Sequence, residues 1–280
     1  GEVSFGGMSS STALDLHGIK LRWYDYWLKG IDNGVKEDPP VKIFVMGKNI
    51  WRSEYDWPLS RTKYTKYYLH SSGNANTSEG DGILSVNLPG DEPWDAYLYN
   101  PNNPVPTRGG ALCFYQVAYT PGAFDQTNIE ARSDVLVYSS EPLLHDLEVT
   151  GPVTVTLYAS SSATDTDFTA KLIDLCVCGS AVNLTDGIIR ARYRESTGKA
   201  KLIMPGWVYE YKIDLWATSN IFKLGHRLRV EVSSSNFPRF DRNTNTGNRL
   251  GQGTKTKPAS QMIFHNARYP SHVTLPLIPS

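Results

Sequence analysis

The chain has 280 residues, of which 40% are hydrophobic and 20% charged, and its 28 lysines and arginines balance 28 aspartates and glutamates. This composition predicts one large folded domain, or one domain with part of another, and excludes a disordered chain. A neutral chain lacks the positive field that attracts nucleic acid or an anionic membrane, so neither partner is expected. No apolar run reaches the roughly 20 residues of a membrane-spanning helix.

The first residues, GEVSFGGMSSST, lack an initiator methionine and resemble the interior of a longer protein. We therefore expect a fragment, and the sequence leaves its compartment open. Residues 10–30 then have the pattern of a long helix, with hydroxyl residues at 10–12 as candidate N-caps and Gly30 as the C-terminal stop. Apolar side chains recur on one face of this helix, at Leu16, Ile19, Trp23 and Trp27.

From residue 41 onward the hydrophobic period changes to two, which is typical of strands. Val153, Val155 and Leu157, for example, alternate with polar or aromatic neighbours. Residues 207–216 alternate in the same way, which places Trp207 among the inward side chains. The strands expected from this pattern cover residues 41–47, 66–71, 134–140, 153–161, 187–194, 207–216, 226–234 and 272–278. Many short strands with long connections predict a mainly β, two-sheet sandwich of the jelly-roll type.

Residues 225–243, GHRLRVEVSSSNFPRFDRN, contain a histidine, three consecutive serines and an aspartate. On an extended strand, His226 and Ser234 lie about 26 Å apart, so they cannot form a catalytic pair. Alternation places His226 on the core-facing side with Leu228, whereas Arg227, Arg229 and Glu231 face the other way and can pair with each other or with a neighbouring strand. We expect a structural strand here.

Other catalytic motifs are missing from the sequence. No serine has glycine two residues before and two after it, and there is no P-loop, dinucleotide fingerprint or HExxH pair. The stretch Asp241–Gln252 resembles a calcium loop, but its glycine falls one place late and glutamine replaces the expected glutamate, so an asparagine-rich turn is expected. Asp165 and Asp167 are expected as turn or surface acids. We predict no cofactor and no metal site.

Cysteine usage adds little. Cys176 and Cys178 alternate along an apparent strand and share one face, and neighbouring positions of that kind are poor disulfide partners. These two residues and Cys113 are all expected as buried thiols.

Several runs together are specific for one family. They include LRWYDYWLKGIDNGVKEDPPVKIFVMG, DLEVTGPVTVTLYASSSATDTDFTAKLIDL and GHRLRVEVSSSNFPRFDRNTNTG. In this order they resemble the C-terminal half of the cocaine esterase and X-Pro dipeptidyl-peptidase family of serine hydrolases, which includes glutaryl acylases and α-amino acid ester hydrolases. In that family an α/β-hydrolase domain carries the serine, aspartate and histidine triad, and a jelly-roll (galactose-binding-like) domain follows it.

The resemblance implies that residues 1–35 are the last helix of an α/β-hydrolase domain and residues 36–280 the jelly-roll domain. The partner it implies is the catalytic domain, with homo-oligomer contacts as a further role. No triad motif is present, so no catalytic residue is assigned and the chain alone is expected to be inactive. Candidates for the substrate cleft or the interdomain surface are Trp51, Trp57, Phe124, Asp125, Gln126, Phe237 and Arg239.

Two other interpretations stay open. Jelly rolls also serve as carbohydrate-binding modules, in which exposed rings form a platform for sugars; the rings available are Trp51, Trp57, Trp94, Trp207 and Trp216. The second of these interpretations is that the chain is itself an enzyme with an unrecognised site. A row of exposed rings would favour the sugar-binding interpretation, whereas a hydrophobic surface without a partner would favour the hydrolase interpretation.

Overall fold

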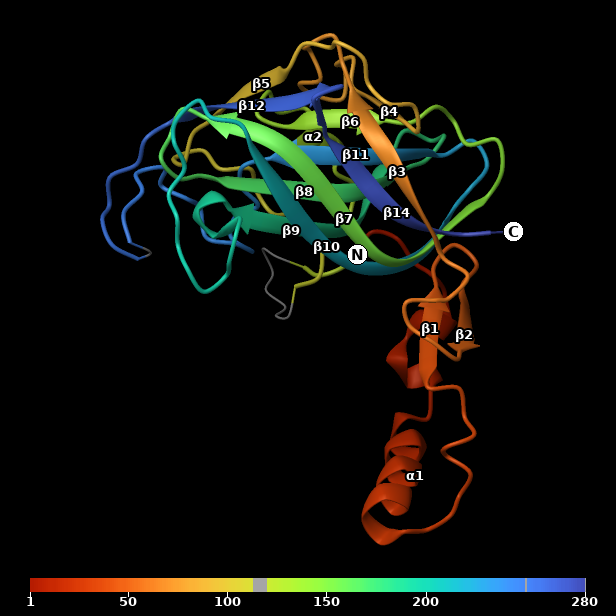
Figure 1. The fold of residues 1–280 in the computed structure, drawn as a ribbon. Coiled ribbons are helices and arrows are strands. Elements are labelled where there is room, and N and C mark those ends of the chain that lie inside the picture. The colour runs from red at the N-terminus through yellow and green to blue at the C-terminus, as the bar shows by residue number, and fades with distance from the viewer. Residues whose placement is uncertain (113–119, 250, 280) are drawn as a thin grey trace.

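The computed structural model describes residues 1–112, 120–249 and 251–279 of the chain. It is a β-sandwich from which an N-terminal arm extends (Figure 1). The arm holds α1 (Leu16–Lys29) and the hairpin of β1 (Val41–Val45) and β2 (Ile50–Glu54). The expectation for Cys113 lies outside the described residues.

One layer of the sandwich is centred on β7 (Leu147–Ser161). This strand pairs with β10 (Tyr209–Phe222), β12 (Ala259–Asn266) and β14 (His272–Ile278). Three further strands extend the layer: β3 (Lys63–His70) beside β14, and β5 (Asp95–Tyr99) and β13 (Tyr269–Pro270) beside β12.

The other layer is centred on β11 (Arg227–Ser233), which lies between β6 (Leu136–Ser139) and β8 (Asp167–Leu175). Strand β9 (Ala181–Arg190) pairs with the far edge of β8. The short strand β4 (Ile83–Ser85) joins the layers, because it pairs with both β3 and β6. The short helix α2 (Thr127–Glu130) precedes β6.

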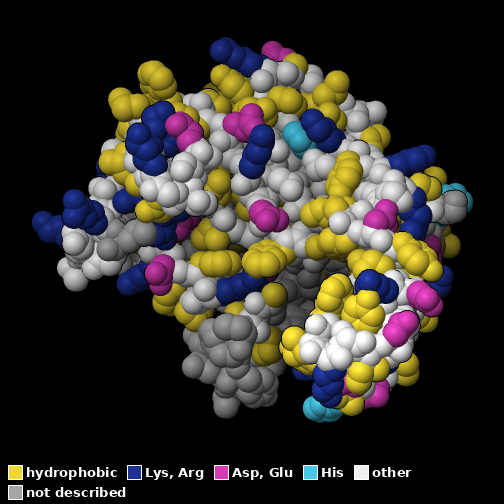
Figure 2. Space-filling view, turned by 60° about the horizontal axis from the view of Figure 1, so that its bottom comes forward, with side chains coloured by type: hydrophobic (Ala, Val, Ile, Leu, Met, Phe, Trp, Pro, Cys, Tyr) yellow, Lys and Arg dark blue, Asp and Glu magenta, His cyan; other side chains and the backbone are white. Residues whose placement is uncertain are grey.

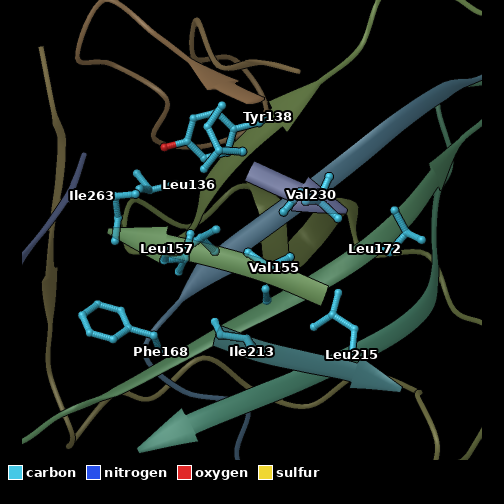
Figure 3. Packing of buried hydrophobic residues seen from close by; sticks show 14 of the residues in the cluster. Leu136, Tyr138, Val155, Leu157, Phe168, Leu172, Ile213, Leu215, Val230 and Ile263 are labelled. Carbon is cyan, nitrogen blue, oxygen red and sulfur yellow. The ribbon is translucent and has the colours of Figure 1, made fainter. Parts of the chain in front are cut away.

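Apolar side chains from both layers meet in one core. Figure 3 shows Val155 and Leu157 of β7 and Ile213 of β10 in the same cluster as Phe168 of β8 and Val230 of β11. Alternation produces this arrangement, since every second residue of a half-buried strand faces the core. The mainly β sandwich expected from the sequence is confirmed.

Strand β10 shows where alternation misleads. Tyr211, Ile213 and Leu215 are buried as expected. Trp207 lies before the strand, and 64% of it is exposed, so its prediction as an inward side chain is wrong. Trp216 sits at a register shift between Asp214 and Ala217, with φ of 65° and 72% of its surface exposed. The exposure of Trp216 agrees with its outward position in the alternation, and the bulge changes the pairing register of the residues that follow it.

Two carboxylates expected at the surface are buried. Asp165 accepts a hydrogen bond from Arg192 Nε at 2.8 Å, and Asp167 accepts one from Arg190 Nε at 2.8 Å. The side-chain amide of Asn243 bonds both carboxylates, at 2.8 Å each. The prediction of surface acids is wrong because their partners come from distant parts of the chain. Asn243, which belongs to the asparagine-rich turn, thus binds both acids through its side-chain amide.

Two charged side chains on the outer face of β11, Arg229 and Glu231, are buried as well. Arg229 Nη1 lies 2.5 Å from Glu130 Oε2, and Lys171 Nζ lies 2.9 Å from Glu231 Oε2. The predicted pairing with a neighbouring strand is confirmed for Glu231, whereas the partner of Arg229 lies on helix α2. His226 is half-buried and contacts Asp174 Oδ1 through Nδ1 at 2.7 Å, so its assignment to the core is wrong.

The prediction of buried thiols is wrong for Cys176 and Cys178. Cys176 and Cys178 lie in the turn between β8 and β9, where a disulfide joins them. A turn brings the two side chains together in a way that an extended strand cannot, and Cys178 is exposed.

Candidate interdomain surface

The N-terminal arm is attached to one end of the sandwich through its hairpin. Met46, just after β1, exchanges backbone hydrogen bonds with Ser219 and Ile221 of β10 at 3.0 and 2.9 Å. Arg52 of β2 forms a bidentate ion pair with Glu148 of β7, at 3.0 and 2.6 Å. These contacts fix the hairpin, so the arm has a rigid base.

Helix α1 extends beyond this base. Asp15 caps its start by accepting a hydrogen bond from Gly18 N at 2.9 Å, and Gly30 ends it at φ 68°. The expected C-terminal stop is confirmed, whereas the expected N-caps at residues 10–12 lie in or beside two short 3₁₀ turns. Arg22 holds the helix to the chain that follows it, by an ion pair with Asp38 at 2.7 Å.

No residue of α1 is buried. Its apolar side chains are open to solvent, and Ile19, Trp23, Trp27 and Leu28 are 48%, 52%, 55% and 76% exposed. Figure 2, which brings the lower side of Figure 1 forward, shows hydrophobic side chains gathered on this face of the molecule. We call residues Leu16–Ile31 with their exposed apolar side chains the helix surface. An apolar area of this kind marks a contact site for another protein surface.

Two of the predicted candidates lie on the arm. Trp51 of β2 is half-buried against Phe44, with ring centroids 5.5 Å apart, and its indole Nε1 donates to Met8 O at 2.7 Å. Trp57 follows β2 and is 41% exposed. Trp51 therefore fastens the N-terminal turns to the hairpin, and Trp57 presents a ring to solvent.

The other candidates meet on the sandwich, through the segment 105–110. Phe237 O accepts from Thr107 N at 2.7 Å, and Arg239 N donates to Thr107 Oγ1 at 3.1 Å. On the other side of the same segment, Arg108 Nε donates to Asp125 O at 2.6 Å. The structure thus brings together residues that are more than 100 positions apart in the sequence.

Gln126 is fully buried within this group. Its Nε2 donates to Arg108 O at 2.9 Å, and its Oε1 accepts from Lys171 Nζ at 2.8 Å. Asp125 Oδ1 accepts from Ala181 N at 2.9 Å; burial opposes ionisation, but this bond and those from Thr127 keep the pKa of Asp125 below its usual value. These side chains hold the loop in place, while Phe237 is 38% exposed.

The sequence did not indicate how the N-terminal residues are bound. Glu2 N donates to Ala123 O at 2.7 Å, and the Glu2 carboxylate accepts from Arg108 Nη2 at 2.7 Å and from Asp125 N at 2.9 Å. Val3 and Phe5 line a mainly apolar cavity of about 270 Å³ beside β8 and β9. The chain therefore runs from the candidate loop, along the sandwich, to the helix surface.

The serine stretch has no catalytic geometry. Ser233, Ser234 and Ser235 are buried, and their hydroxyls bond Thr169 Oγ1, Tyr97 OH and Val105 N at 2.6, 2.9 and 2.8 Å. Across residues 1–112, 120–249 and 251–279, no hydrogen bond joins a serine hydroxyl to a histidine ring. The hydrogen bonds of these three serines hold the end of β11 to β5, to β8 and to the segment that contains Val105.

One buried histidine does contact an aspartate, as in a catalytic dyad. His265 Nε2 lies 2.8 Å from Asp95 Oδ2, and Tyr138 OH and Ser71 Oγ also donate to Asp95 at 2.7 Å each. Both His265 and Asp95 are fully buried, so no substrate can reach them. Burial opposes charge on both groups, but their hydrogen bonds and neighbouring charges together outweigh it, raising the pKa of His265 and lowering that of Asp95. The pair supports the fold.

In the described part of the chain, no three His, Cys, Asp or Glu side chains are grouped so that they could hold a metal ion. No described helix has the length and apolar character required to cross a membrane.

Comparison with known proteins identifies the family. Residues 33–274 match the family model of the X-Pro dipeptidyl-peptidase C-terminal non-catalytic domain. The chain belongs to this family. Among curated relatives, a cocaine esterase from Rhodococcus sp. (strain MB1 Bresler) is 48% identical over 258 residues, which cover 91% of this chain and 45% of the esterase.

Solved structures agree with this assignment to the X-Pro dipeptidyl-peptidase C-terminal domain family. An aminopeptidase from the marine sediment archaeon Thaumarchaeota archaeon superposes on the whole chain with a TM-score of 0.83 at 30% identity, over 46% of its own length. An α-amino acid ester hydrolase matches 91% of the chain with a TM-score of 0.76 at 28% identity, over 43% of its length. The chain thus spans less than half the length of these relatives.

Proposed function

We propose that this chain is the accessory domain of a serine hydrolase that cleaves esters or amides, and that it packs against an α/β-hydrolase catalytic domain. The observation that carries the proposal is the helix surface, in which a capped helix of 14 residues has no buried residue. A short helix is marginal in water unless its apolar face is packed. Family membership and the names of the esterase and ester hydrolase relatives support the chemical class.

The proposal divides the chain at about residue 35. Residues 1–35 would belong to the catalytic domain, with the helix surface packed within it and residues 2–5 lying along the sandwich, and residues 36–280 would form the accessory jelly roll. The ion pair between Arg22 and Asp38 spans this boundary and would hold the helix at a fixed place relative to the sandwich. The chain by itself would then have no hydrolase activity.

The exposed rings of Trp57 and Phe237 are our candidates for contact with the catalytic domain or the rim of its cleft. Trp51, Phe124, Asp125, Gln126 and Arg239 would position these surfaces. Arg239 does so through its ion pair with Asp186, a largely buried contact. Homo-oligomer contacts remain a further proposed role for this domain.

A double substitution, Trp23→Ala with Trp27→Ala, tests the proposal. In the protein encoded by the complete gene, truncating two rings buried between domains should lower the free energy of unfolding by about 3 kcal/mol or more. In the present chain, where both rings are exposed, the change should stay within about 0.5 kcal/mol. Urea unfolding of both proteins measures this.

Trp216→Ala is the control, because Trp216 is also an exposed tryptophan, at 72%, but lies on β10 and not on the helix surface. It should leave both proteins unchanged. Equal effects of the double substitution in the two proteins would contradict an interdomain role for the helix surface.

A sugar-binding function is the second candidate, and one observation favours it. Rings follow one another across β12, β13 and β7: Trp94 to Phe264 at 5.8 Å, Phe264 to Tyr269 at 5.7 Å, and Tyr269 to Tyr158 at 5.7 Å. Of these, Trp94 is 52% exposed. Calorimetric titration with oligosaccharides tests this function, and saturable binding lost in Trp94→Ala would support it.

A further inference from the structure

The turn between β8 and β9 carries a second chemistry that the proposed function does not use. Cys176 and Cys178 are joined by a disulfide, and their Cα atoms are 5.2 Å apart, within the range that disulfides require. Cys178 is exposed and Cys176 is half-buried, while Val177 between them is 79% exposed. One sulfur of the pair is therefore open to a reagent from solvent.

The disulfide is not needed to close the hairpin. Cys176 N donates to Ser180 O and Gly179 N donates to Cys176 O, both at 3.0 Å, and strand pairing reaches Leu175 and Ala181. The ring encloses only residues 176–178, and the stabilisation by a disulfide grows with the length of the loop that it closes. The bond can therefore open while the backbone of the turn keeps its hydrogen bonds.

One backbone donor beside Cys176 favours its release as a thiolate, although the apolar walls around it oppose charge. The backbone N–H of Cys178 points to Cys176 Sγ, with 3.0 Å between nitrogen and sulfur. A donor of this kind stabilises negative charge on the sulfur. Both cysteines line the mainly apolar cavity of about 270 Å³, together with Val3, Phe5 and His226.

We propose that Cys176 and Cys178 form a thiol–disulfide exchange site that accepts two electrons from a dithiol. One thiolate of the dithiol attacks Cys178 Sγ, the Sγ–Sγ bond breaks, and Cys176 leaves as a thiolate. The second thiol of the reductant then attacks the mixed disulfide and releases Cys178. The dithiol becomes a cyclic disulfide, and the two protons that it loses are taken up by Cys176 and Cys178. The inference does not depend on the proposed hydrolase role.

Alkylation followed by mass spectrometry tests the site in the folded chain, with dithiothreitol as the dithiol. The reduced chain should carry two more alkylated cysteines than the oxidised chain, without denaturant. Cys176→Ser and Cys178→Ser should each abolish this difference. Reduction should shift the melting temperature by no more than about 3 °C, because the hairpin stays closed.

Several results would overturn the proposal. The first is full alkylation of the chain before any reductant is added, and the second is reduction that requires denaturant. A redox difference that persists in Cys176→Ser would show that another pair is responsible. A much larger fall in melting temperature on reduction would show that the disulfide is required for the stability of the fold.

Discussion

At the scale of single residues, the polar contacts inside the sandwich belong to its stability. His265 and Asp95 lie at the centre of a network that joins β5, β6 and β12, with Glu92 Oε2 3.4 Å from His265 Nδ1. Because hydrogen bonds and neighbouring carboxylates outweigh burial, the pKa of His265 is raised. Its protonated form is therefore stabilised by folding.

This raised pKa predicts how stability depends on pH. The contribution of His265 is complete below its unfolded pKa of about 6.5 and is lost as pH rises through the higher folded value. Urea unfolding of the wild type should thus show a steeper loss of stability above neutral pH than His265→Gln. The variant should also be less stable at pH 6, by about 3 kcal/mol, because Asp95 loses its buried partner.

Glu130 titrates in an overlapping range, since burial, with the charge of Glu231, raises its pKa to about 7. It is unchanged in both proteins, so the difference between their pH profiles reports His265. Parallel profiles would contradict a charged His265 in the folded chain.

At the scale of elements, alternation predicted the central strands well. The inward side chains of β7 and β10 were identified because both strands have one core-facing and one solvated face. Strands β5 and β12 were missed because they carry polar residues inward: Asp95 and His265 bond each other, and Gln261 bonds Thr166. Asp165 and Asp167 were predicted at the surface because nothing near them in the sequence indicates their partners. Those partners are Arg190, Arg192 and Asn243, which are remote in sequence.

The candidate surface was predictable only in part. The apolar face of α1 was evident from the spacing of Trp23 and Trp27. The contact of Glu2 with Arg108, which fixes the N-terminal segment, has no sequence signal, because it joins residues 106 positions apart. Gln126 was identified as a surface candidate, yet it is buried against Lys171, a partner that its own neighbours in the chain do not reveal.

Helix α1 gives a prediction at this scale. Its backbone amides should exchange with solvent rapidly in the present chain, because no tertiary packing protects them, whereas those of β7 should exchange only on global unfolding. Hydrogen exchange followed by mass spectrometry resolves the two segments. In the product of the complete gene, the amides of α1 should become protected. Protection of α1 equal to that of β7 in the present chain would contradict an unpacked helix surface.

At the scale of the whole molecule, the chain is a sandwich whose buried polar groups are largely, though not all, hydrogen-bonded within the fold, and an arm whose helix has no packing partner among the described residues. The sandwich accounts for its own serines, acids and histidines through structural contacts. The exposed apolar side chains of the arm are explained if a neighbouring domain covers them. Together with membership of the X-Pro dipeptidyl-peptidase C-terminal domain family, this supports an accessory role within a larger hydrolase.

The most direct test of this account is hydrolysis of a p-nitrophenyl ester and an X-Pro p-nitroanilide, by the present chain and by the protein encoded by the complete gene. The account predicts turnover by the longer protein and none above buffer by the chain alone. Turnover by the chain alone that persists through repeated purification would contradict it, and would place a catalytic site within these 280 residues.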